Sequence, residues 1–379
     1  MSQLEQFGHG GDLVTAEAHF GILREKMLDF SANINPLGPP DSILQSIREG
    51  LTAIVHYPDP GHRSFRRVLA DKLQISDAWI LPGNGAAECM ALAILALAPR
   101  KVGVVYPCFS EYETLAKQFG AEIIACYTKE VERFKARKDE LYPLFVETDL
   151  VFIGSPNNPT GTVYSKDELI EMAKWCDHTN TYLAVDEAFL HFVEDGSKLT
   201  LLDELERFPR VMLIRSLTKM FAIPGLRLGY TIAHPALIDR MKQKQVTWSV
   251  NGLALLAGEQ CVKEEHYEQE TRQLIRTERA FLVEQLQRKL GWSVMPSEAN
   301  YLLVRCTDEI TADELQQKTG YKGILIRNCS MYPGLSPYHF RIAVRTREEN
   351  EQLLAAMIEV RDTVKDSIKD KDTAERRGE

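Results

Sequence analysis

The sequence predicts an α/β protein in which a large domain with a mostly parallel central sheet precedes a smaller α+β C-terminal domain. Between residues 79 and 217, short and almost continuously apolar segments alternate with amphipathic helical segments. Such strands, separated by helices, are typical of a parallel sheet that is covered on both faces. After residue 250 the pattern changes to long helical segments and three short strands, which favours an α+β arrangement. A length of 379 residues suits two packed domains.

The composition is that of a soluble globular protein, with 44% hydrophobic and 26% charged residues. The net charge of −9 argues against nucleic acid as the main partner. Seven dispersed cysteines without a C-x-x-C pair predict reduced thiols, with neither disulfides nor a metal site. The longest apolar run is too short for a bilayer, and no signal peptide is visible. We therefore expect a cytoplasmic protein that binds no membrane.

Changes in composition along the chain predict its division into domains. We expect residues 1–40 to form an N-terminal arm that packs with the small domain, residues 41–250 to form the large domain, and residues 251–364 to form the small domain. Residues 365–379 are highly charged and offer almost nothing to bury, which predicts a disordered tail.

The N-terminal arm begins with a glycine-rich segment, residues 7–12, that contains His9 and Gly10. This segment is either a disordered tail or an arm whose backbone and imidazole approach an anion closely. Residues 29–38 follow as an extended segment, with Asn33 and a second asparagine before a Pro-Gly turn, where such side chains often cap backbone groups.

The large domain is predicted to begin with helices at residues 41–51 and 64–73, on either side of a turn cluster at residues 57–61. A G-x-G-x-x-E segment, residues 83–88, then precedes a helix at residues 89–97. It is a weak nucleotide signal because it lacks the third glycine, but the N-terminus of a helix is a credible cradle for a phosphate.

Six strands are predicted in the large domain, with a helix at residues 166–178 between the fourth and the fifth. The strands are residues 79–81, 102–106, 121–126, 150–154, 182–185 and 211–214. Asn158, Asp186 and Lys219 follow the last three of these strands. Because ligands of parallel sheets bind at the carboxyl ends of the strands, we expect these three side chains to meet.

The small domain is predicted to contain helices at residues 252–263, 266–290 and 348–364 and strands at residues 301–304, 323–326 and 340–345. Arg341 and Arg345 alternate with apolar residues in the last strand, so both lie on the face opposite the apolar one. They are candidates for holding an anion, or they form an ordinary solvated face.

The chemistry predicted from these residues starts with Lys219. An amine at the exit of a buried strand can lose its proton by desolvation and attack a carbonyl. Ser216 and Arg227, in the same loop, would suit a phosphate. A lysine, a phosphate and an aldehyde together suggest pyridoxal phosphate, held as a Schiff base on Lys219. The alternative is a solvated surface turn.

Asp186 ends an apolar strand, where a carboxylate is costly unless a cation partners it. A pyridinium nitrogen would be such a partner and would keep the ring an electron sink; otherwise Asp186 caps a helix. Asn158 could hydrogen-bond the 3′ oxygen of the ring, and Phe109 could stack on its face or be a core aromatic.

With these motifs the chain resembles the fold-type I pyridoxal phosphate enzymes, and among them the class I/II aminotransferases. The resemblance rests on residues 158–161, 186–189, 216–219 and 225–230, in the order and spacing of the family. It implies Lys219 as the Schiff-base lysine, Asp186 as the partner of the pyridine nitrogen and Asn158 as the ligand of the 3′ oxygen. It also implies a homodimer and a cofactor phosphate held by Gly85, Ala86, Ser216, Arg227 and, from the partner subunit, Tyr57.

Within that family the chain is most similar to the L-threonine-O-3-phosphate decarboxylases of cobalamin biosynthesis. The similarity rests on residues 9–11, 29–38, 248–251, 324–327 and 332–334, and on Phe189, where the aminotransferases usually have tyrosine. It implies a small phosphorylated amino acid as substrate and (R)-1-amino-2-propanol O-2-phosphate as product. Arg341 would hold the carboxylate, and Arg327, His9, Gly10 and Asn33 the phosphate and neighbouring groups.

Two alternatives stay open. The histidinol-phosphate aminotransferases share the core motifs, and the cofactor chemistry is the same in both enzymes, so the orientation of the substrate decides between decarboxylation and transamination. The other alternative is a pyridoxal-phosphate-binding regulator without catalytic activity, a class that generally carries an added DNA-binding domain.

Overall fold

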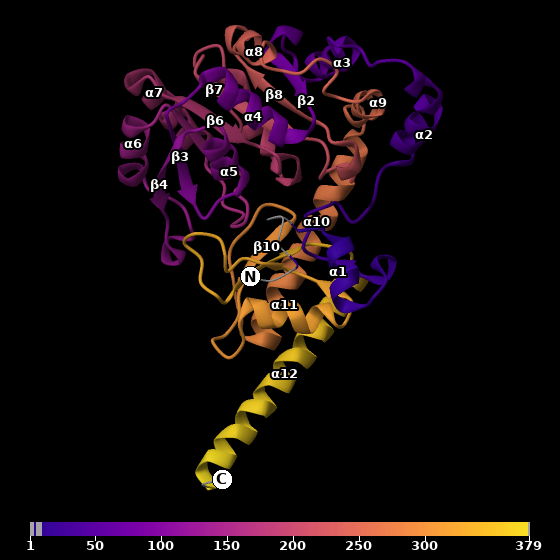
Figure 1. Cartoon of the computed structure of the whole chain (residues 1–379), viewed down its shortest axis with the longest axis vertical. Helices are drawn as coiled ribbons and strands as arrows, with labels where there is room; N and C mark the ends of the chain where they lie inside the picture. The colour runs from indigo at the N-terminus through magenta and orange to yellow at the C-terminus, as the bar shows by residue number, and fades with distance from the viewer. Residues whose placement is uncertain (1–3, 5–9, 378–379) are drawn as a thin grey trace. The chain divides into compact units, whose positions relative to one another are not determined.

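The structure is a computed structural model that describes residue 4 and residues 10–377, with side chains up to residue 366. It divides into two compact units (Figure 1). The larger unit is Ile34–Gln273, and the smaller unit combines Met1–Asn33 with Leu274–Glu379.

A seven-stranded sheet forms the centre of the larger unit. Its strands are β2 (Ile80–Gly83), β3 (Lys101–Tyr106), β4 (Glu122–Tyr127), β5 (Leu150–Gly154), β6 (Tyr182–Asp186), β7 (Val211–Ser216) and β8 (Gly229–Ala233). They lie in the order β2-β8-β7-β6-β5-β3-β4. The contiguous strands β7, β6, β5, β3 and β4 are parallel, whereas β8 pairs antiparallel with both β7 and β2. The expected mostly parallel sheet is therefore confirmed.

Helices cover both faces of this sheet (Figure 1). They are α2 (Asp41–Gly50), α3 (Arg63–Leu73), α4 (Gly85–Leu97), α5 (Glu111–Gln118), α6 (Lys138–Glu147), α7 (Lys166–Thr179), α8 (Pro235–Lys242) and α9 (Gly252–Cys261). Buried side chains of α4, α5 and α8 form one core cluster with Val102 and Val104 of β3. Gly103 lies between these two valines, so a Cβ at this position would be on the other face of the sheet, where it would meet Leu144 of α6. Helix α6 therefore covers the opposite face.

The strand order brings the predicted chemistry together. Because β5, β6 and β7 are neighbours, the residues that follow them emerge side by side at the carboxyl edge of the sheet. Gly229 of β8 pairs with Ser216 on one side and with Gly83 on the other. The end of β7 is therefore only one strand away from the start of α4.

The smaller unit contains a four-stranded antiparallel sheet in the order β12-β13-β10-β9 and a separate parallel pair, β1 with β11. The strands are β1 (Leu28–Asp29), β9 (Ser293–Val294), β10 (Tyr301–Arg305), β11 (Ile324–Leu325), β12 (Arg327–Asn328) and β13 (His339–Ala343). Its helices include α1 (Leu13–Phe20), α11 (Ala312–Gly320) and α12 (Arg347–Arg377), while α10 (Glu265–Gln285) crosses the division between the units.

Several elements differ from the expectation. The strand expected at residues 323–326 is split into β11 and β12, which belong to different sheets, and β13 ends before Arg345. Helix α12 continues to Arg377, through the tail that was expected to be disordered. The physical reason is that lysine, arginine and glutamate have high helix propensity even where they bury little.

The division between the units also differs from the expected boundaries. It falls after Gln273 and not after residue 250, because α9 packs on α2 and α3. A Cβ at Gly258 would lie 2.5 Å from Leu228 and 2.8 Å from Phe65, so this glycine permits the close approach of α9. Residues 34–40, expected in the arm, belong to the larger unit.

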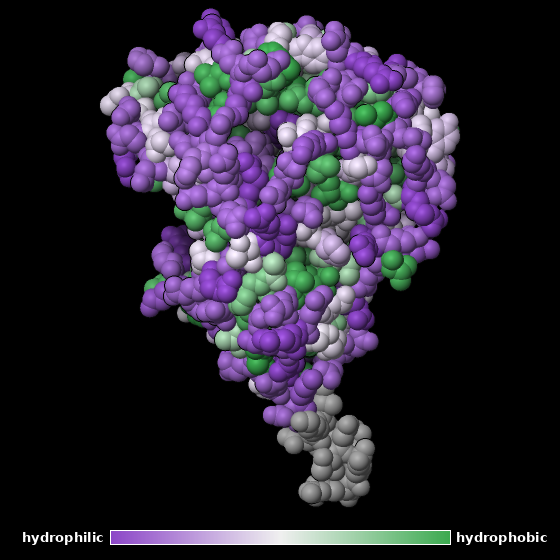
Figure 2. Space-filling view, turned by 180° about the vertical axis from the view of Figure 1, so that it is seen from behind, coloured by the Kyte–Doolittle hydropathy of each residue, from purple (hydrophilic) through white to green (hydrophobic). Residues whose placement is uncertain are grey.

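Hydrophilic residues predominate on the face shown in Figure 2, where hydrophobic residues form small scattered groups. Within residues 10–377, no helix is both long enough and apolar enough to pass through a bilayer. The described residues also contain no cluster of three or more His, Cys, Asp or Glu side chains suited to a metal ion.

Candidate active site

Lys219 lies in the loop that follows β7, three residues after the end of the strand. Its Nζ is 3.5 Å from Ser216 Oγ. Burial and the neighbouring Arg227 lower the pKa of Lys219 to about 8, and the Asp186 carboxylate only partly opposes them. Near neutral pH the neutral amine, which is the state that attacks a carbonyl, is therefore far more abundant than in an ordinary lysine.

Asn35 holds the backbone of this loop. Its N–H donates to the Lys219 carbonyl at 3.1 Å, and its Nδ2 donates to the Met220 carbonyl at 2.8 Å. The same Nδ2 lies 2.7 Å from Thr271 Oγ1, and Asn35 Oδ1 accepts from the Leu37 N–H. Asn35 thus caps a turn, as asparagines before a Pro-Gly turn often do, and it also holds the backbone of the loop that carries Lys219.

Asp186 ends β6 and is 8% exposed. Tyr112 donates its hydroxyl to Asp186 Oδ2 at 2.6 Å, and the Ala188 N–H donates to Oδ1 at 3.0 Å. Burial raises the pKa of the Asp186 carboxyl above its usual value, while these two hydrogen bonds and the charge of Lys219 act in the opposite direction. The carboxylate is therefore held beside the amine in a position where a cationic ligand would be favoured.

The N-terminus of α4 and the loop after β7 lie against each other. A Cβ at Gly85, whose φ is +81°, would lie 2.4 Å from Arg227 Nη2, and a Cβ at Gly229 would lie 2.6 Å from the Ala86 nitrogen. Arg227 itself has left-handed backbone geometry, with φ 58°. The free N–H groups at the start of α4 and the Arg227 guanidinium together can bind an anion such as a phosphate.

Ser216 closes β7 and is buried. Its Oγ is 2.8 Å from Thr218 Oγ1 and 3.5 Å from Lys219 Nζ. The hydroxyl thus lies beside the amine, one strand away from the start of α4, as the prediction of a shared phosphate site requires.

Phe109 and Asn158 come from the loops after β3 and β5. The ring of Phe109 meets that of Tyr112 edge to face, with centroids 5.7 Å apart. Asn158 follows Asn157, whose Nδ2 donates to the Pro107 carbonyl at 2.9 Å and to Thr160 Oγ1 at 2.8 Å. Asn157 therefore ties the loop that carries Asn158 to the segment that carries Phe109.

Tyr57 is the predicted cofactor residue that lies outside this cluster. It is 78% exposed, and its ring stacks on that of Trp248 at a centroid distance of 4.4 Å. Trp248 holds this position with an unusual backbone φ of 62°. The tyrosine is thus exposed on the surface of the larger unit.

The two predicted arginines of the smaller unit are buried and lie on neighbouring strands. Arg327 of β12 is the direct partner of Arg341 of β13 in the antiparallel register. Arg341 donates to the Ser31 carbonyl at 2.6 Å and lies over the Tyr301 ring, with 5.5 Å from Cζ to the centroid. Residues directly opposite each other in an antiparallel pair lie on the same face of the sheet, so this face carries two buried cationic side chains.

The other predicted substrate residues lie near Ser31 or outside the described residues. A Cβ at Gly10 would lie 2.3 Å from the Ser31 carbonyl oxygen, so only glycine allows this approach of the arm. Asn33 is buried, and within the described part of the chain its Oδ1 has no hydrogen-bond partner. His9 lies outside the described residues.

Four residues of this region were not predicted as site residues from the sequence: Tyr112, Asn157, Asn35 and Asn251. Tyr112 lies in the first turn of α5, and Phe109 precedes the N-cap of that helix, so helical spacing does not pair the two side chains. Asn251 caps α9 through its Oδ1 and donates from Nδ2 to the Leu226 carbonyl at 3.0 Å, next to Arg227. Asparagines that hold backbone groups far away in the sequence leave no periodic signal.

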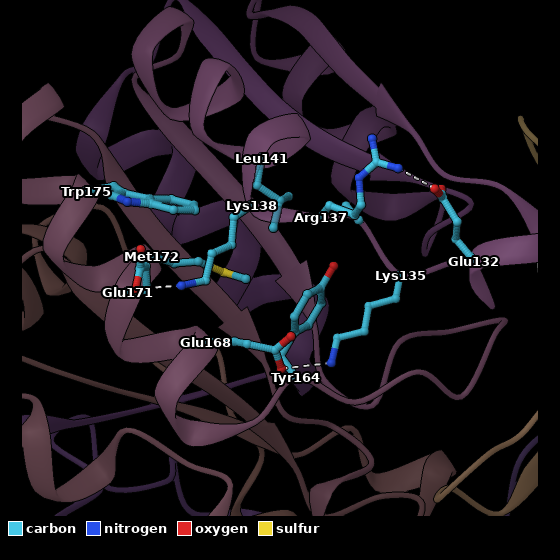
Figure 3. A pocket seen from close by; sticks show the side chains of 11 residues that line it. Glu132, Lys135, Arg137, Lys138, Leu141, Tyr164, Glu168, Glu171, Met172 and Trp175 are labelled. Atoms are coloured by element: carbon cyan, nitrogen blue, oxygen red, sulfur yellow. Dashed lines mark hydrogen bonds and ion pairs between the residues drawn. The ribbon is translucent and has the colours of Figure 1, made fainter.

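A separate cavity of about 320 Å³ lies at α6 and α7 and contains none of the predicted site residues (Figure 3). Tyr164, Leu141, Met172 and Trp175 supply its apolar and aromatic lining. Its three basic side chains are each paired with a carboxylate: Lys135 with Glu168, Lys138 with Glu171, and Arg137 with Glu132. Lys138–Glu171 joins α6 to α7, Lys135–Glu168 ties the segment before α6 to α7, and Arg137–Glu132 lies within that segment. Because each cation already has a carboxylate partner, these pairs fit a structural role better than a role in binding an anion.

Comparisons with known proteins identify relatives of this chain. The family model described as Aminotransferase class I and II matches residues 25–357. The chain is 38% identical to a threonine-phosphate decarboxylase of Salmonella typhimurium, over 92% of this chain and 95% of that protein. It is 32% identical to the adenosylcobalamin biosynthesis bifunctional protein CobDQ of Leptospira interrogans, over 92% of this chain and 40% of that protein. A solved histidinol-phosphate aminotransferase of Clostridium acetobutylicum is 31% identical, with a TM-score of 0.83, over 89% of this chain and 100% of that one.

Proposed function

Because this chain belongs to the aminotransferase class I and II family, we propose that it decarboxylates L-threonine O-3-phosphate with pyridoxal 5′-phosphate as its cofactor. The observation that carries the proposal is the 38% identity to a threonine-phosphate decarboxylase over almost the whole of both chains. The relation to the CobDQ protein supports a role in making the amino-propanol phosphate of cobalamin.

The residues of the larger unit fit this cofactor. A Cβ at Gly85 would fill the space where Arg227 and the first turn of α4 can receive a phosphate. Asp186 is buried at the end of a strand and keeps acceptor positions for a protonated ring nitrogen. Lys219 has an amine of lowered pKa for the aldehyde. We therefore assign the phosphate to Gly85, Ala86, Ser216 and Arg227, and the ring to Phe109, Asn158 and Asp186.

When bound, pyridoxal 5′-phosphate supplies an aldehyde for the amino group of the substrate and a protonated ring that withdraws electrons from its α-carbon. Asp186 would keep the ring nitrogen protonated through its negative charge. Lys219 would hold, at its Nζ, the proton that the Cα of the substrate needs after carbon dioxide has left. Phe189 has no hydroxyl, so Asn158 is the residue that we assign to the 3′ oxygen of the cofactor.

The substrate brings two anionic groups, a carboxylate and a phosphate. We assign the carboxylate to Arg341, and the phosphate and neighbouring groups to Arg327, His9, Gly10 and Asn33. The register of β12 and β13 supports this assignment, because it places two buried cationic side chains on the same face of the sheet, and a guanidinium binds carboxylate and phosphate groups. For decarboxylation, the substrate would have to be held so that the bond between its Cα and its carboxylate is the one that the cofactor weakens.

The second candidate is histidinol-phosphate aminotransferase, which the solved structure at 31% identity favours. That reaction would use the same lysine and aspartate, but Lys219 would remove a proton from Cα. It also needs a keto acid, such as 2-oxoglutarate, as a second substrate.

The test is to mix the holoenzyme with O-phospho-L-threonine, without any keto acid, and to measure carbon dioxide. We expect release over many turnovers, with one amine product for each carbon dioxide. A single loss of the visible absorbance that 2-oxoglutarate then restores, without carbon dioxide, would instead identify an aminotransferase. The Lys219→Ala chain is the control and is expected to release almost none.

We further propose a homodimer in the cytoplasm. Five exposed apolar side chains of the larger unit, which we call the apolar patch, support the dimer: Ile54, Val55, Tyr57, Val246 and Trp248. Three of them line a cavity of about 580 Å³. Exposed apolar groups of this kind mark association surfaces. Seven free cysteines support a reducing compartment.

A further inference from the structure

Tyr112 lies at the centre of the proposed ring site. Its side chain is 1% exposed, and its ring stacks on Phe152 of β5, with centroids 5.0 Å apart and planes within 8°. The edge of the ring meets Phe109, the residue assigned to the face of the cofactor. Its hydroxyl reaches Asp186, the residue assigned to the ring nitrogen, at 2.6 Å. Tyr112 thus joins two of the three side chains that we assign to the ring.

The hydrogen bonds of Asp186 define where a third donor can approach. An ionised carboxylate accepts about four hydrogen bonds, two on each oxygen. The Ala188 N–H occupies one position on Oδ1, and the Tyr112 hydroxyl occupies one on Oδ2. Because one donor is bound to each oxygen, the plane of the carboxylate is fixed, and each oxygen keeps a position for the ring nitrogen.

The backbone leaves room for this hydroxyl. A Cβ at Gly154, where β5 ends beside β6, would lie 3.2 Å from Tyr112 Oη and 2.9 Å from Asn157 Oδ1. Only glycine at this position therefore lets the tyrosine and the asparagine reach their partners without displacement.

We propose that Tyr112 is a positioning residue for the cofactor: its hydroxyl keeps Asp186 ionised and aimed at the pyridine nitrogen. The inference rests on the proposed function only in that it requires pyridoxal phosphate, whichever bond of the substrate is broken. A hydrogen bond to a carboxylate favours its charged form. Without it, burial would raise the pKa of Asp186 further, and the proton of the ring nitrogen would be held less well.

The experiment compares two cofactors in the Tyr112→Phe variant. One is pyridoxal 5′-phosphate, and the other is its 1-deaza analogue, in which a C–H group replaces the ring nitrogen. We expect the variant to bind pyridoxal phosphate about tenfold more weakly than the wild type does, as the loss of one hydrogen bond to a charged group predicts. We expect it to bind the deaza analogue as the wild type does, because that ring offers Asp186 no proton.

Tyr106→Phe is the matched control. Tyr106 also donates its hydroxyl to a carboxylate, that of Glu113 on α5, but this bond does not involve Asp186. The control is expected to bind both cofactors with wild-type affinity. A Tyr112→Phe chain that weakens both cofactors equally, or neither, would overturn the proposal, because the hydroxyl would then act on the packing or have no effect.

A second measurement reads the protonation of the ring directly and does not depend on affinity. The nitrogen-15 chemical shift of a labelled ring nitrogen reports its protonation at saturating cofactor. We expect the ring in Tyr112→Phe to lose its proton at a lower pH than in the wild type, and an unchanged titration would contradict the role. Both measurements are made without substrate, so they test the role of Tyr112 even if the decarboxylation assay fails.

Discussion

Lys219 shows how the surroundings of one residue prepare its chemistry. Burial and Arg227 lower its pKa to about 8, from an ordinary 10.5. At pH 8 about half of the Lys219 amine is neutral, roughly 100 times the fraction expected for an ordinary lysine. We expect acetic anhydride to label Lys219 of the cofactor-free chain at a rate that levels off above pH 8, whereas exposed lysines continue to accelerate. Peptide mass spectrometry of the labelled chain gives both rates.

Arg227→Met is the matched variant, since it removes a neighbouring cation from the same loop. The plateau of Lys219 labelling is expected to move to higher pH in this variant. A Lys219 rate that follows the exposed lysines would contradict the assignment of a desolvated amine.

The lowered pKa of Lys219 also makes stability depend on pH. Between pH 8 and 10.5 the unfolded chain binds more protons than the folded chain, so the free energy of unfolding of the cofactor-free protein increases as the pH rises through this window.

At the scale of elements, the start of α4 tests the phosphate cradle. In Gly85→Ala, the new Cβ would lie 2.4 Å from Arg227 Nη2, so the guanidinium must move away from the N-terminus of the helix. We expect this variant to bind pyridoxal phosphate at least tenfold more weakly but to bind pyridoxal, which has no phosphate, almost unchanged, because phosphate contacts are the strong charge-assisted ones. Equilibrium dialysis of the two compounds measures both affinities.

Gly120→Ala separates crowding from backbone strain. Gly120 has a φ of +84°, close to the +81° of Gly85, but a Cβ there would meet no atom within 4 Å. Both variants therefore carry the same penalty for left-handed geometry, and only Gly85→Ala displaces Arg227. Equal losses of pyridoxal phosphate affinity in the two variants would mean that the cradle is not at α4.

The elements also show which parts of the site the sequence could reveal. The apolar runs of β5, β6 and β7 predicted these strands within two residues, and the polar residues at their ends predicted where chemistry gathers. Strand β8 was missed because its first two residues, Gly229 and Tyr230, were interpreted as the end of a phosphate-binding loop and the other three were assigned to no element. The bond from Tyr112 to Asp186 joins residues 74 positions apart, and only the fold brings them together. The opposition of Arg327 and Arg341 likewise depends on the register of β12 and β13.

At the scale of the molecule, the division into units was the least predictable feature. The glycines of α2 and α9 are small residues in apolar surroundings, and their effect appears only in three dimensions. A Cβ at Gly50 would lie 2.5 Å from Leu256, and one at Gly258 would lie 2.5 Å from Leu228. These close approaches place α9 in the larger unit, although its sequence follows the change of pattern at residue 250. Packing, and not composition, therefore sets the boundary.

The apolar patch leads to a prediction for the whole molecule. Ile54 and Val55 are 69% and 77% exposed, and we expect Ile54→Asp combined with Val55→Asp to convert a dimer into a chain of 43.0 kDa, because two buried charges without partners oppose association. Light scattering after size exclusion gives the mass.

The control replaces Val131 and Val146 with aspartate. These two valines are 89% and 56% exposed and lie outside the patch, so this variant is expected to remain a dimer. Since Tyr57 lies within the patch, the monomeric variant is also expected to bind pyridoxal phosphate more weakly. A wild-type chain of 43.0 kDa at micromolar concentration would refute the dimer, and a dimer that persists in the Ile54 and Val55 variant would place its interface elsewhere.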